Sequence, residues 1–155
     1  FFGTAPTHHI FGQRAALDMM IDEGRENIFR RHRILAGTVW SAFEKWETKK
    51  VLKLNIKDLS KRSTAVTTFR ADGYDLTHLR QWLQYNTGLE LGHGVGFSDL
   101  KYLEGKSVCR IAHMGHINPV MILGAITSIE AGFSACKIPF GEGGSGAAAA
   151  FIAMK

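Results

Sequence analysis

The sequence predicts an α/β domain in which a small, mostly antiparallel sheet carries helices on one face. Two observations support this fold class. Hydrophobic residues recur at steps of three and four in some segments, and form short β-branched or apolar runs in others. Along the chain these segments follow the order helix, helix, strand, strand, helix, strand, strand, helix. The 155 residues, 45% of them hydrophobic, are enough for one ordinary globular domain.

Two helices are predicted at the start, with a break at Gly24. The first covers about residues 6–21. The second is a long amphipathic helix whose apolar positions recur from Ile28 to Trp46, with Arg30, Arg31, Arg33 and Lys45 largely on its solvent side.

Four short strands and a third helix are expected next. The strands are predicted at residues 51–56, 64–69, 89–91 and 107–111. Asp72-Gly73 predicts a turn, and Asp75 can cap a helix that continues to about Tyr85.

A further helix is predicted to begin at Asn118-Pro119, because an Asn cap followed by Pro is a typical helix start. Its buried stripe is expected to be Ile122, Ala125, Ile126, Ile129 and Phe133. Residues 141–155 are expected to be a flexible tail, with a glycine-rich connector before a short helix or frayed end.

Composition excludes several classes of function. The longest apolar stretch, 120–129, is far shorter than the ~20 residues a membrane helix needs, so no membrane partner is expected. The net charge of +5 comes from residues 45–62, which hold seven basic and two acidic residues. A solvated surface explains this segment better than a nucleic-acid site, which would need interleaved aromatics or a groove-reading helix. Cys109 and Cys136 lie in apolar segments, which is typical of free thiols in a cytoplasmic protein.

No metal site and no catalytic residue is predicted within the chain. Cys109, His113 and His116 could be written as a metal pattern, but strand alternation leaves His116 beyond the turn at Gly115. His8 and His9 are adjacent on a helix and therefore point in different directions. Spacing alone assembles no nucleophile with its base and orienting acid.

Arg110 is the strongest candidate binding residue. It lies in the apolar strand pattern VCRIA, where its neighbours Cys109 and Ile111 alternate to the opposite face. A guanidinium in such a place needs an anion, either a carboxylate of the domain or a substrate carboxylate held in bidentate fashion. The glycine-rich stretch Gly92–Gly96 lacks the context of a nucleotide-binding loop, although its glycines permit close approach of the backbone to a ligand.

Four segments together resemble the C-terminal part of a class V aminotransferase. They are TAPTHHIFGQRAALDMMIDEGRENIFRRHR (4–33), GYDLTHLRQWL (73–83), LELGHGVG (89–96) and KSVCRIAHMGHINP (106–119). The similarity is to the serine–glyoxylate and alanine–glyoxylate (serine–pyruvate) aminotransferases, which are pyridoxal-phosphate enzymes of fold type I. It covers nearly all of this chain but under half of such an enzyme.

The resemblance implies roles for two residues. Arg110 matches the arginine that binds the α-carboxylate of the substrate, and Thr4 matches a threonine that contacts the cofactor phosphate of the neighbouring subunit. It therefore implies a homodimer that transfers an amino group from a small amino acid, serine or alanine, to a keto acid such as glyoxylate. The Schiff-base lysine belongs to the larger domain, upstream of Phe1. By this resemblance the chain alone should be inactive and should not hold pyridoxal 5'-phosphate.

The resemblance also divides the chain. Residues 1–24 would lead from a missing large domain, 25–140 would form the small C-terminal domain, and 141–155 the tail. An initiating Met is absent, which agrees with a fragment. Phe1 replaces a Tyr common in the family, and the HINP sequence (116–119) departs from a more polar version, which affects the expected acceptor specificity.

Two alternatives remain. A cysteine desulfurase or lyase of the same class is disfavoured because Cys109 and Cys136 are predicted in a strand and a helix and not in a mobile loop. A standalone binding domain would use the basic segment, residues 45–62.

Overall fold

The computed structural model describes residues 3–155, which form two compact units. The first is the chain up to Arg31, and the second is His32–Lys155. The boundary falls inside a helix, seven residues beyond the Gly24 break that the sequence analysis used as a boundary. Phe1, which replaces the family tyrosine, lies outside the described residues.

The first unit contains α1 (Thr7–Glu23) and the first turns of α2 (Arg25–Trp46). Gly24 separates the two helices with a φ of 82°, and its N–H donates to the carbonyl of Met20. Across this break the Arg31 guanidinium donates to both carboxylate oxygens of Glu23, at 2.6 and 2.8 Å. The predicted helical pair and its interruption are confirmed. None of the α1 residues is buried.

The second unit is built on a four-stranded antiparallel sheet with strand order β1-β2-β4-β3. Its strands are β1 (Leu52–Leu54), β2 (Val66–Ala71), β3 (Gly92–His93) and β4 (Val108–Ala112). A short 3₁₀ turn, η1 (Glu47–Lys49), precedes β1, and two more, η2 (Leu59–Lys61) and η3 (Leu100–Gly105), precede β2 and β4. The antiparallel sheet is confirmed, but β3 was expected at 89–91 and lies further along the chain. Its pairing is with β4, where Gly92 opposes Arg110.

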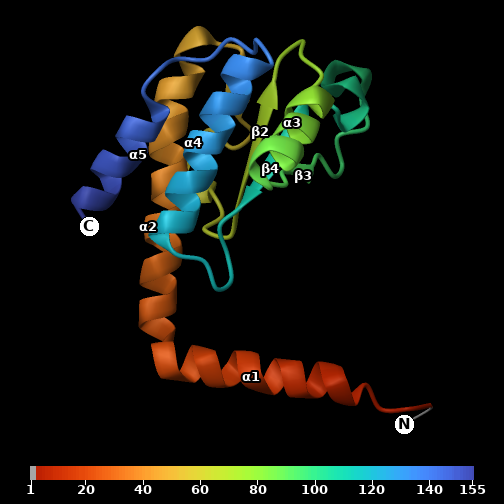
Figure 1. Cartoon of the computed structure of the whole chain (residues 1–155), viewed down its shortest axis with the longest axis vertical. Coiled ribbons are helices and arrows are strands. Elements are labelled where there is room, and N and C mark those ends of the chain that lie inside the picture. The colour runs from red at the N-terminus through yellow and green to blue at the C-terminus, as the bar shows by residue number, and fades with distance from the viewer. Residues whose placement is uncertain (1–2) are drawn as a thin grey trace. The chain divides into compact units, whose positions relative to one another are not determined.

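One sheet face and four helices form the core (Figure 1). The helices are the later turns of α2, then α3 (Thr77–Thr87), α4 (Pro119–Ala135) and α5 (Gly144–Ala153), of which α5 contributes Ala148. The core is centred on four aromatic rings, which pack with centroids 4.9–6.3 Å apart, close to the range favoured by aromatic pairs. These rings are Phe43, Trp46, Phe69 and Phe133. The predicted α4 stripe is buried at Ile122, Ile126, Ile129 and Phe133, and Ala125 is only partly covered.

Both predicted helix starts are made by the expected side chains. The Asp75 carboxylate accepts from the backbone N–H of Thr77 at 2.8 Å, at the start of α3. The Asn118 side chain accepts from the N–H of Met121 at 3.0 Å, and Pro119 opens α4. These contacts satisfy amide groups that a helix start leaves without an internal partner.

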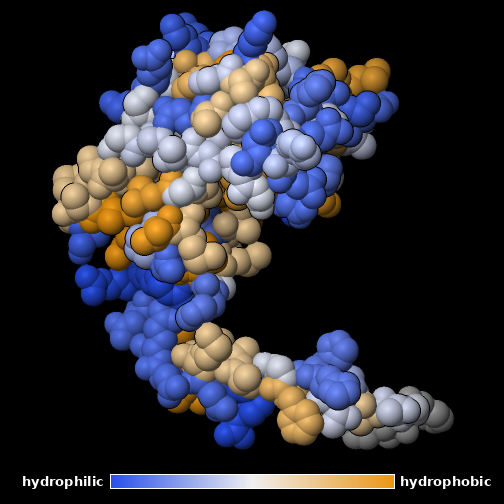
Figure 2. Space-filling view, viewed as in Figure 1, coloured by the Kyte–Doolittle hydropathy of each residue, from blue (hydrophilic) through white to orange (hydrophobic). Residues whose placement is uncertain are grey.

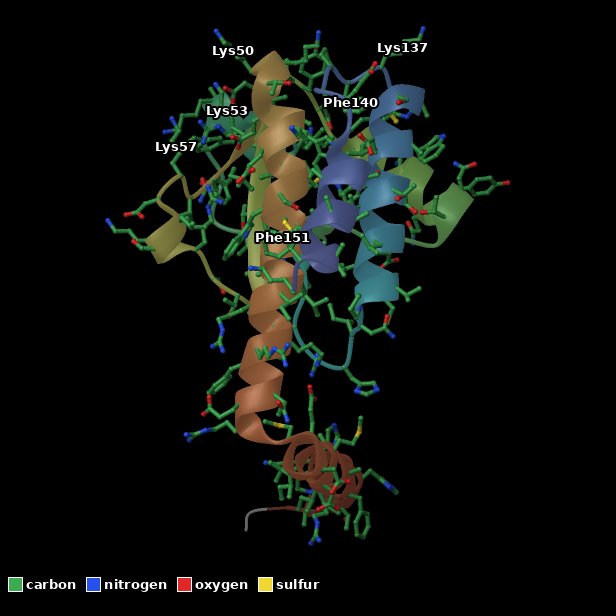
Figure 3. All side chains as sticks on the ribbon, turned by 90° about the vertical axis from the view of Figure 1, so that its left-hand side faces the viewer. Lys50, Lys53, Lys57, Lys137, Phe140 and Phe151 are labelled. Carbon is green, nitrogen blue, oxygen red and sulfur yellow. The ribbon has the colours of Figure 1, made fainter. Side chains whose placement is uncertain are left out.

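Of the two states expected for the end of the chain, a short helix or a frayed end, the structure shows the helix, which already begins within the glycine-rich connector. Gly144–Ala153 forms helix α5, which packs beside α4 (Figure 1). The Glu130 carboxylate of α4 accepts from the backbone N–H groups of Gly144 and Ser145, at 3.0 and 2.9 Å. Phe151 projects from α5 towards α2 (Figure 3), where Gly37 leaves room for its ring. The glycine-rich composition suggested flexibility, but two of the glycines permit close packing, because a Cβ at Gly141 would clash with Lys45 and one at Gly144 with Trp46.

The surface of this unit is partly apolar. Figure 2 shows apolar residues gathered over α5 and the first turns of α4, where Val120, Met121 and Met154 are exposed. Among the described residues, no helix combines the length and the apolar character needed to cross a membrane.

Candidate functional site

Strand β4 places Arg110 on the sheet face opposite the core. Cys109 and Ile111, its neighbours in sequence, are buried against the helices, whereas Arg110 is only partly covered. Thr68, its partner on β2, is also partly exposed on that face. The strand alternation that the sequence predicted for Arg110 is therefore confirmed.

The Arg110 side chain lies across the neighbouring edge strand, β3. Its Nε–H donates to the backbone carbonyl of His93 at 2.7 Å. A Cβ atom at Gly92 would lie 3.2 Å from Nε, 3.3 Å from Cβ and 3.4 Å from Nη2 of Arg110. Within residues 3–155 no carboxylate forms an ion pair with Arg110. The alternative of an internal ion pair therefore finds no partner in this part of the chain.

Arg110 lines a cavity of about 380 Å³ between α3 and β3. The lining residues are Arg80, Gln84, Glu90, Leu91, Gly92, His93 and Arg110. Two guanidinium groups face one carboxylate, that of Glu90, which accepts from the Gln84 amide at 2.6 Å. The excess positive charge suits a small anion such as a carboxylate.

Arg80 was not singled out by the sequence analysis. It lies on α3, and its guanidinium contacts the carbonyl of Val108 and the sulfur of Cys109, both at 3.4 Å, and Thr77 Oγ1 at 3.1 Å. Arg80 lies on a helix face with other polar residues, so no sequence pattern marks it as a binding residue. Only the packing of α3 beside the sheet edge reveals that it shares a cavity with Arg110.

The glycine-rich stretch serves packing at two of its positions and a turn at a third. Gly92 makes room for Arg110, and a Cβ at Gly94 would lie 2.6 Å from Cβ of Val108. Gly96 has a φ of 82°, which favours glycine, in a turn that leads towards η3. The stretch does not run from a strand directly into an α-helix, in agreement with its rejection as a nucleotide loop.

The metal pattern is not assembled. His113 is buried and its ring bonds to Thr67 Oγ1 and to the carbonyl of Thr64, whereas His116 is exposed. No group of three or more His, Cys, Asp or Glu side chains in the described part of the chain is placed to hold a metal ion. His8 and His9 are exposed on α1.

The two cysteines do not resemble activated nucleophiles. Burial raises the pKa of the Cys109 thiol, although a hydrogen bond from Arg80 opposes this effect. Burial also raises the pKa of Cys136, which caps the end of α4. A reactive cysteine needs a lowered pKa, because the thiolate is the nucleophile. These environments argue against the desulfurase alternative.

Thr4 belongs to the first unit and Arg110 to the second. Thr4 is exposed in the irregular segment before α1, two residues ahead of Pro6. Its hydroxyl is accessible to a ligand.

Comparison with known proteins finds relatives of this chain among the aminotransferases. It is 35% identical over 122 residues to a serine–glyoxylate aminotransferase of Arabidopsis thaliana, which covers 78% of this chain and 28% of the relative. A serine–glyoxylate aminotransferase of Hyphomicrobium methylovorum is 33% identical over 158 residues, or 98% of this chain and 36% of the relative. Over most of its length the chain is a homologue of the glyoxylate aminotransferases. No protein-family model matches it.

A solved structure gives the same result for the fold. The pyridoxamine–pyruvate aminotransferase of Mesorhizobium loti superposes on 99% of this chain with a TM-score of 0.85 and 27% identity. The match covers 38% of that enzyme. The chain thus has an aminotransferase fold over about a third of the length of the aminotransferases it matches.

The cavity around Arg110 does not by itself fit pyridoxal phosphate. Such enzymes hold the cofactor through a lysine amine and a charged partner of the pyridine nitrogen. The lining described above contains no lysine. The residues of this aminotransferase homologue therefore fit a carboxylate here.

Proposed function

We propose that this chain is the small C-terminal domain of a pyridoxal-phosphate-dependent aminotransferase. The complete protein would transfer an amino group from a small amino acid, serine or alanine, to a keto acid such as glyoxylate. The names of the relatives support this reaction class. The observation that carries the proposal is Arg110, whose guanidinium lines a positively charged cavity and has only a backbone carbonyl as its hydrogen-bond partner among the described residues.

In this proposal Arg110 binds the α-carboxylate of the amino acid. A guanidinium binds a carboxylate through two parallel hydrogen bonds, which fix orientation as well as position. The contribution of Arg110 is to orient the Cα–H bond for proton removal by a group elsewhere in the complete protein. Arg110 itself moves no proton, since guanidinium groups stay charged in proteins.

Thr4 is proposed to contact the cofactor phosphate of a second subunit, so that the complete enzyme is a homodimer. Support comes from the exposed position of Thr4 ahead of α1 and from the aminotransferase relatives. Free thiols at Cys109 and Cys136 favour a reducing compartment, which for this proposal is the cytoplasm.

The test is Arg110→Ala in the complete protein that contains this chain. We expect the KM for the amino acid to rise roughly 10–100-fold, because an interaction with a charged group is lost. The cofactor's absorption band should remain, since Arg110 is not assigned to the cofactor. Arg70→Ala is the matched control, because Arg70 lies on the adjacent strand and pairs with Asp72 at 2.9 Å. An unchanged KM in the Arg110 variant would refute the proposal.

A further inference from the structure

We infer that Gly92 and the backbone carbonyl of His93 position the Arg110 guanidinium so that its terminal nitrogens point towards the substrate carboxylate. Gly92 is thereby a positioning residue. This inference rests on the proposed function of Arg110 and deepens it by specifying which edge of the guanidinium binds.

The hydrogen bond at Nε determines which nitrogens are available. A guanidinium can bind a carboxylate through two hydrogen bonds, donated either from the Nε–Nη2 edge of the guanidinium or from its terminal Nη1–Nη2 edge. In Arg110 the Nε–H is already donated to His93 at 2.7 Å. The carboxylate is therefore bound along the terminal edge, by Nη1 and Nη2.

The missing side chain at Gly92 permits this arrangement. Gly92 pairs directly with Arg110 in the sheet register, so both residues face the same side of the strands. The Arg110 chain crosses β3 over Gly92, and a Cβ there would approach Nε to 3.2 Å and Nη2 to 3.4 Å. Contacts this short require the Arg110 side chain to shift by a few tenths of an ångström. Even an alanine at position 92 therefore moves the guanidinium out of its place beside the His93 carbonyl.

Two other glycines have different structural roles and therefore provide controls within the same fold. A Cβ at Gly94 would lie 2.6 Å from Cβ and 3.0 Å from Cγ1 of Val108, a buried residue, so alanine there strains the packing. Gly124, on α4, has open space around its Cβ position. Alanine at Gly92 should act through Arg110, at Gly94 through stability, and at Gly124 through neither.

The kinetic test uses the complete enzyme and a double-mutant cycle. Gly92→Ala should raise the KM for the amino acid about tenfold, with a smaller change in kcat, as expected for one weakened hydrogen-bonding arrangement. In the Arg110→Ala background the same change should have no further effect, because both act on one interaction. Gly124→Ala should behave like wild type.

Each outcome decides between the two claims. If Arg110→Ala leaves KM unchanged, the proposed function itself fails. If Arg110→Ala raises KM but Gly92→Ala does not, or if the two effects add in full, the positioning role of Gly92 is refuted while the proposed function stands.

A second test of the inference does not require enzyme activity. In the 155-residue chain, the Nε–H of Arg110 should show slower hydrogen exchange by NMR than that of Arg33, which is exposed on α2. Gly92→Ala should remove this protection. Equal exchange at Arg110 and Arg33 in the wild-type chain would overturn the inference even if the variant failed to fold.

Discussion

His113 is buried in the core, where hydrogen bonds fix its tautomer. Trp40 Nε1–H donates to Thr67 Oγ1 at 3.0 Å, so the hydroxyl hydrogen of Thr67 is free to donate to His113 Nε2, at 2.8 Å. The other ring nitrogen, Nδ1, lies 2.9 Å from the carbonyl of Thr64 and must donate to it. A neutral imidazole with its proton on Nδ1 satisfies every one of these contacts.

We predict that this network makes stability depend on pH. Burial lowers the pKa of His113, a hydrogen bond to Thr64 opposes this effect, and the charge of His32 adds to it. Because the folded-state pKa lies below the unfolded value of about 6.5, the unfolded chain binds a proton first as the pH falls. The free energy of unfolding should therefore decrease as the pH falls below about 6.5, and level off below the folded-state pKa.

Urea unfolding from pH 8 to pH 5 checks this prediction. His113→Gln should cost roughly 1–3 kcal/mol at pH 8, through lost buried hydrogen bonds, and should flatten the decrease. His116→Gln is the control, because His116 is exposed. A decrease of the same size in the His113 variant would assign the pH dependence to other groups.

Single residues differed in how far the sequence could predict them. Strand alternation placed Arg110 on the open face correctly, because Cys109 and Ile111 are plainly apolar. The contact between Gly92 and Arg110 was not predictable, since it depends on the register of β3 against β4, and β3 was expected at residues 89–91. The sharing of one cavity by Arg80 and Arg110 likewise depends on how α3 packs.

Among the elements, α5 depends most on a single side chain from elsewhere. Its sequence GSGAAAAFIA lacks acidic residues in its first turn, and Gly143 provides no capping side chain. Glu130 supplies the missing acceptor, and Ser145 Oγ and Trp46 Nε1 also donate to it. A carboxylate at a helix N-terminus is further favoured by the helix dipole.

We predict that Glu130→Gln loosens α5 while the sheet remains folded. Burial alone would raise the Glu130 pKa, but hydrogen bonds from Ser145, Gly144 and Trp46 outweigh this and hold it below the usual value. Loss of the charged cap should lower stability by about 1–2 kcal/mol at pH 7. Since the pKa is lowered in the folded state, the contribution is present above about pH 4.3 and disappears as the pH falls through the folded-state value.

Hydrogen exchange at neutral pH and unfolding at several pH values check this prediction. The amides of α5 should exchange faster in Glu130→Gln, whereas those of β2 and β4 change little. Glu142→Gln is the matched control on an exposed carboxylate in the preceding turn. Equal protection of α5 in both variants would show that apolar packing, and not Glu130, holds the helix.

Elements with strong local signals were predicted well and the others were not. In α2 the apolar positions recur every three or four residues. In the caps of α3 and α4 the capping side chain and the amide it binds are two or three residues apart. Such local signals could be recognised in the sequence. A short helix or a frayed end was expected after the glycine-rich connector, but the packing of α5 was not predictable, because it depends on Glu130, Trp46 and the room left by Gly37, all distant in sequence. Such long-range support leaves no periodic pattern in the segment it stabilises.

At the scale of the whole molecule, positive charge and the candidate site occupy different places. Lys50, Lys53 and Lys57 lie around β1 (Figure 3), whereas the cavity of Arg110 lies beside β3, at the opposite edge of the sheet. Two carboxylates form ion pairs with the basic segment, since Lys53 pairs with Asp72 and Lys61 lies 3.6 Å from Asp58. This partial neutralisation agrees with a solvated surface.

The last prediction concerns cofactor binding by the 155-residue chain alone. Of the contacts that the proposed function requires for pyridoxal phosphate, the chain supplies that of Thr4, whose hydrogen bonds are worth roughly 0.5–1.5 kcal/mol each. Capturing a small ligand costs an estimated ~4–15 kcal/mol in lost translational and rotational freedom. The isolated chain should therefore retain no pyridoxal phosphate after gel filtration and show no transamination of serine with glyoxylate.

Under the proposed function the complete protein should behave differently, because it would add the remaining two thirds of an aminotransferase's length. It should retain the cofactor, shown by a visible absorption band, and should transfer the amino group. Borohydride reduction followed by peptide mapping distinguishes a true site from scattered reaction with surface lysines such as Lys49 and Lys57. Stoichiometric labelling of one lysine within the 155 residues would contradict the prediction, because it would place the cofactor's attachment inside this domain and require new roles for Arg110 and Thr4.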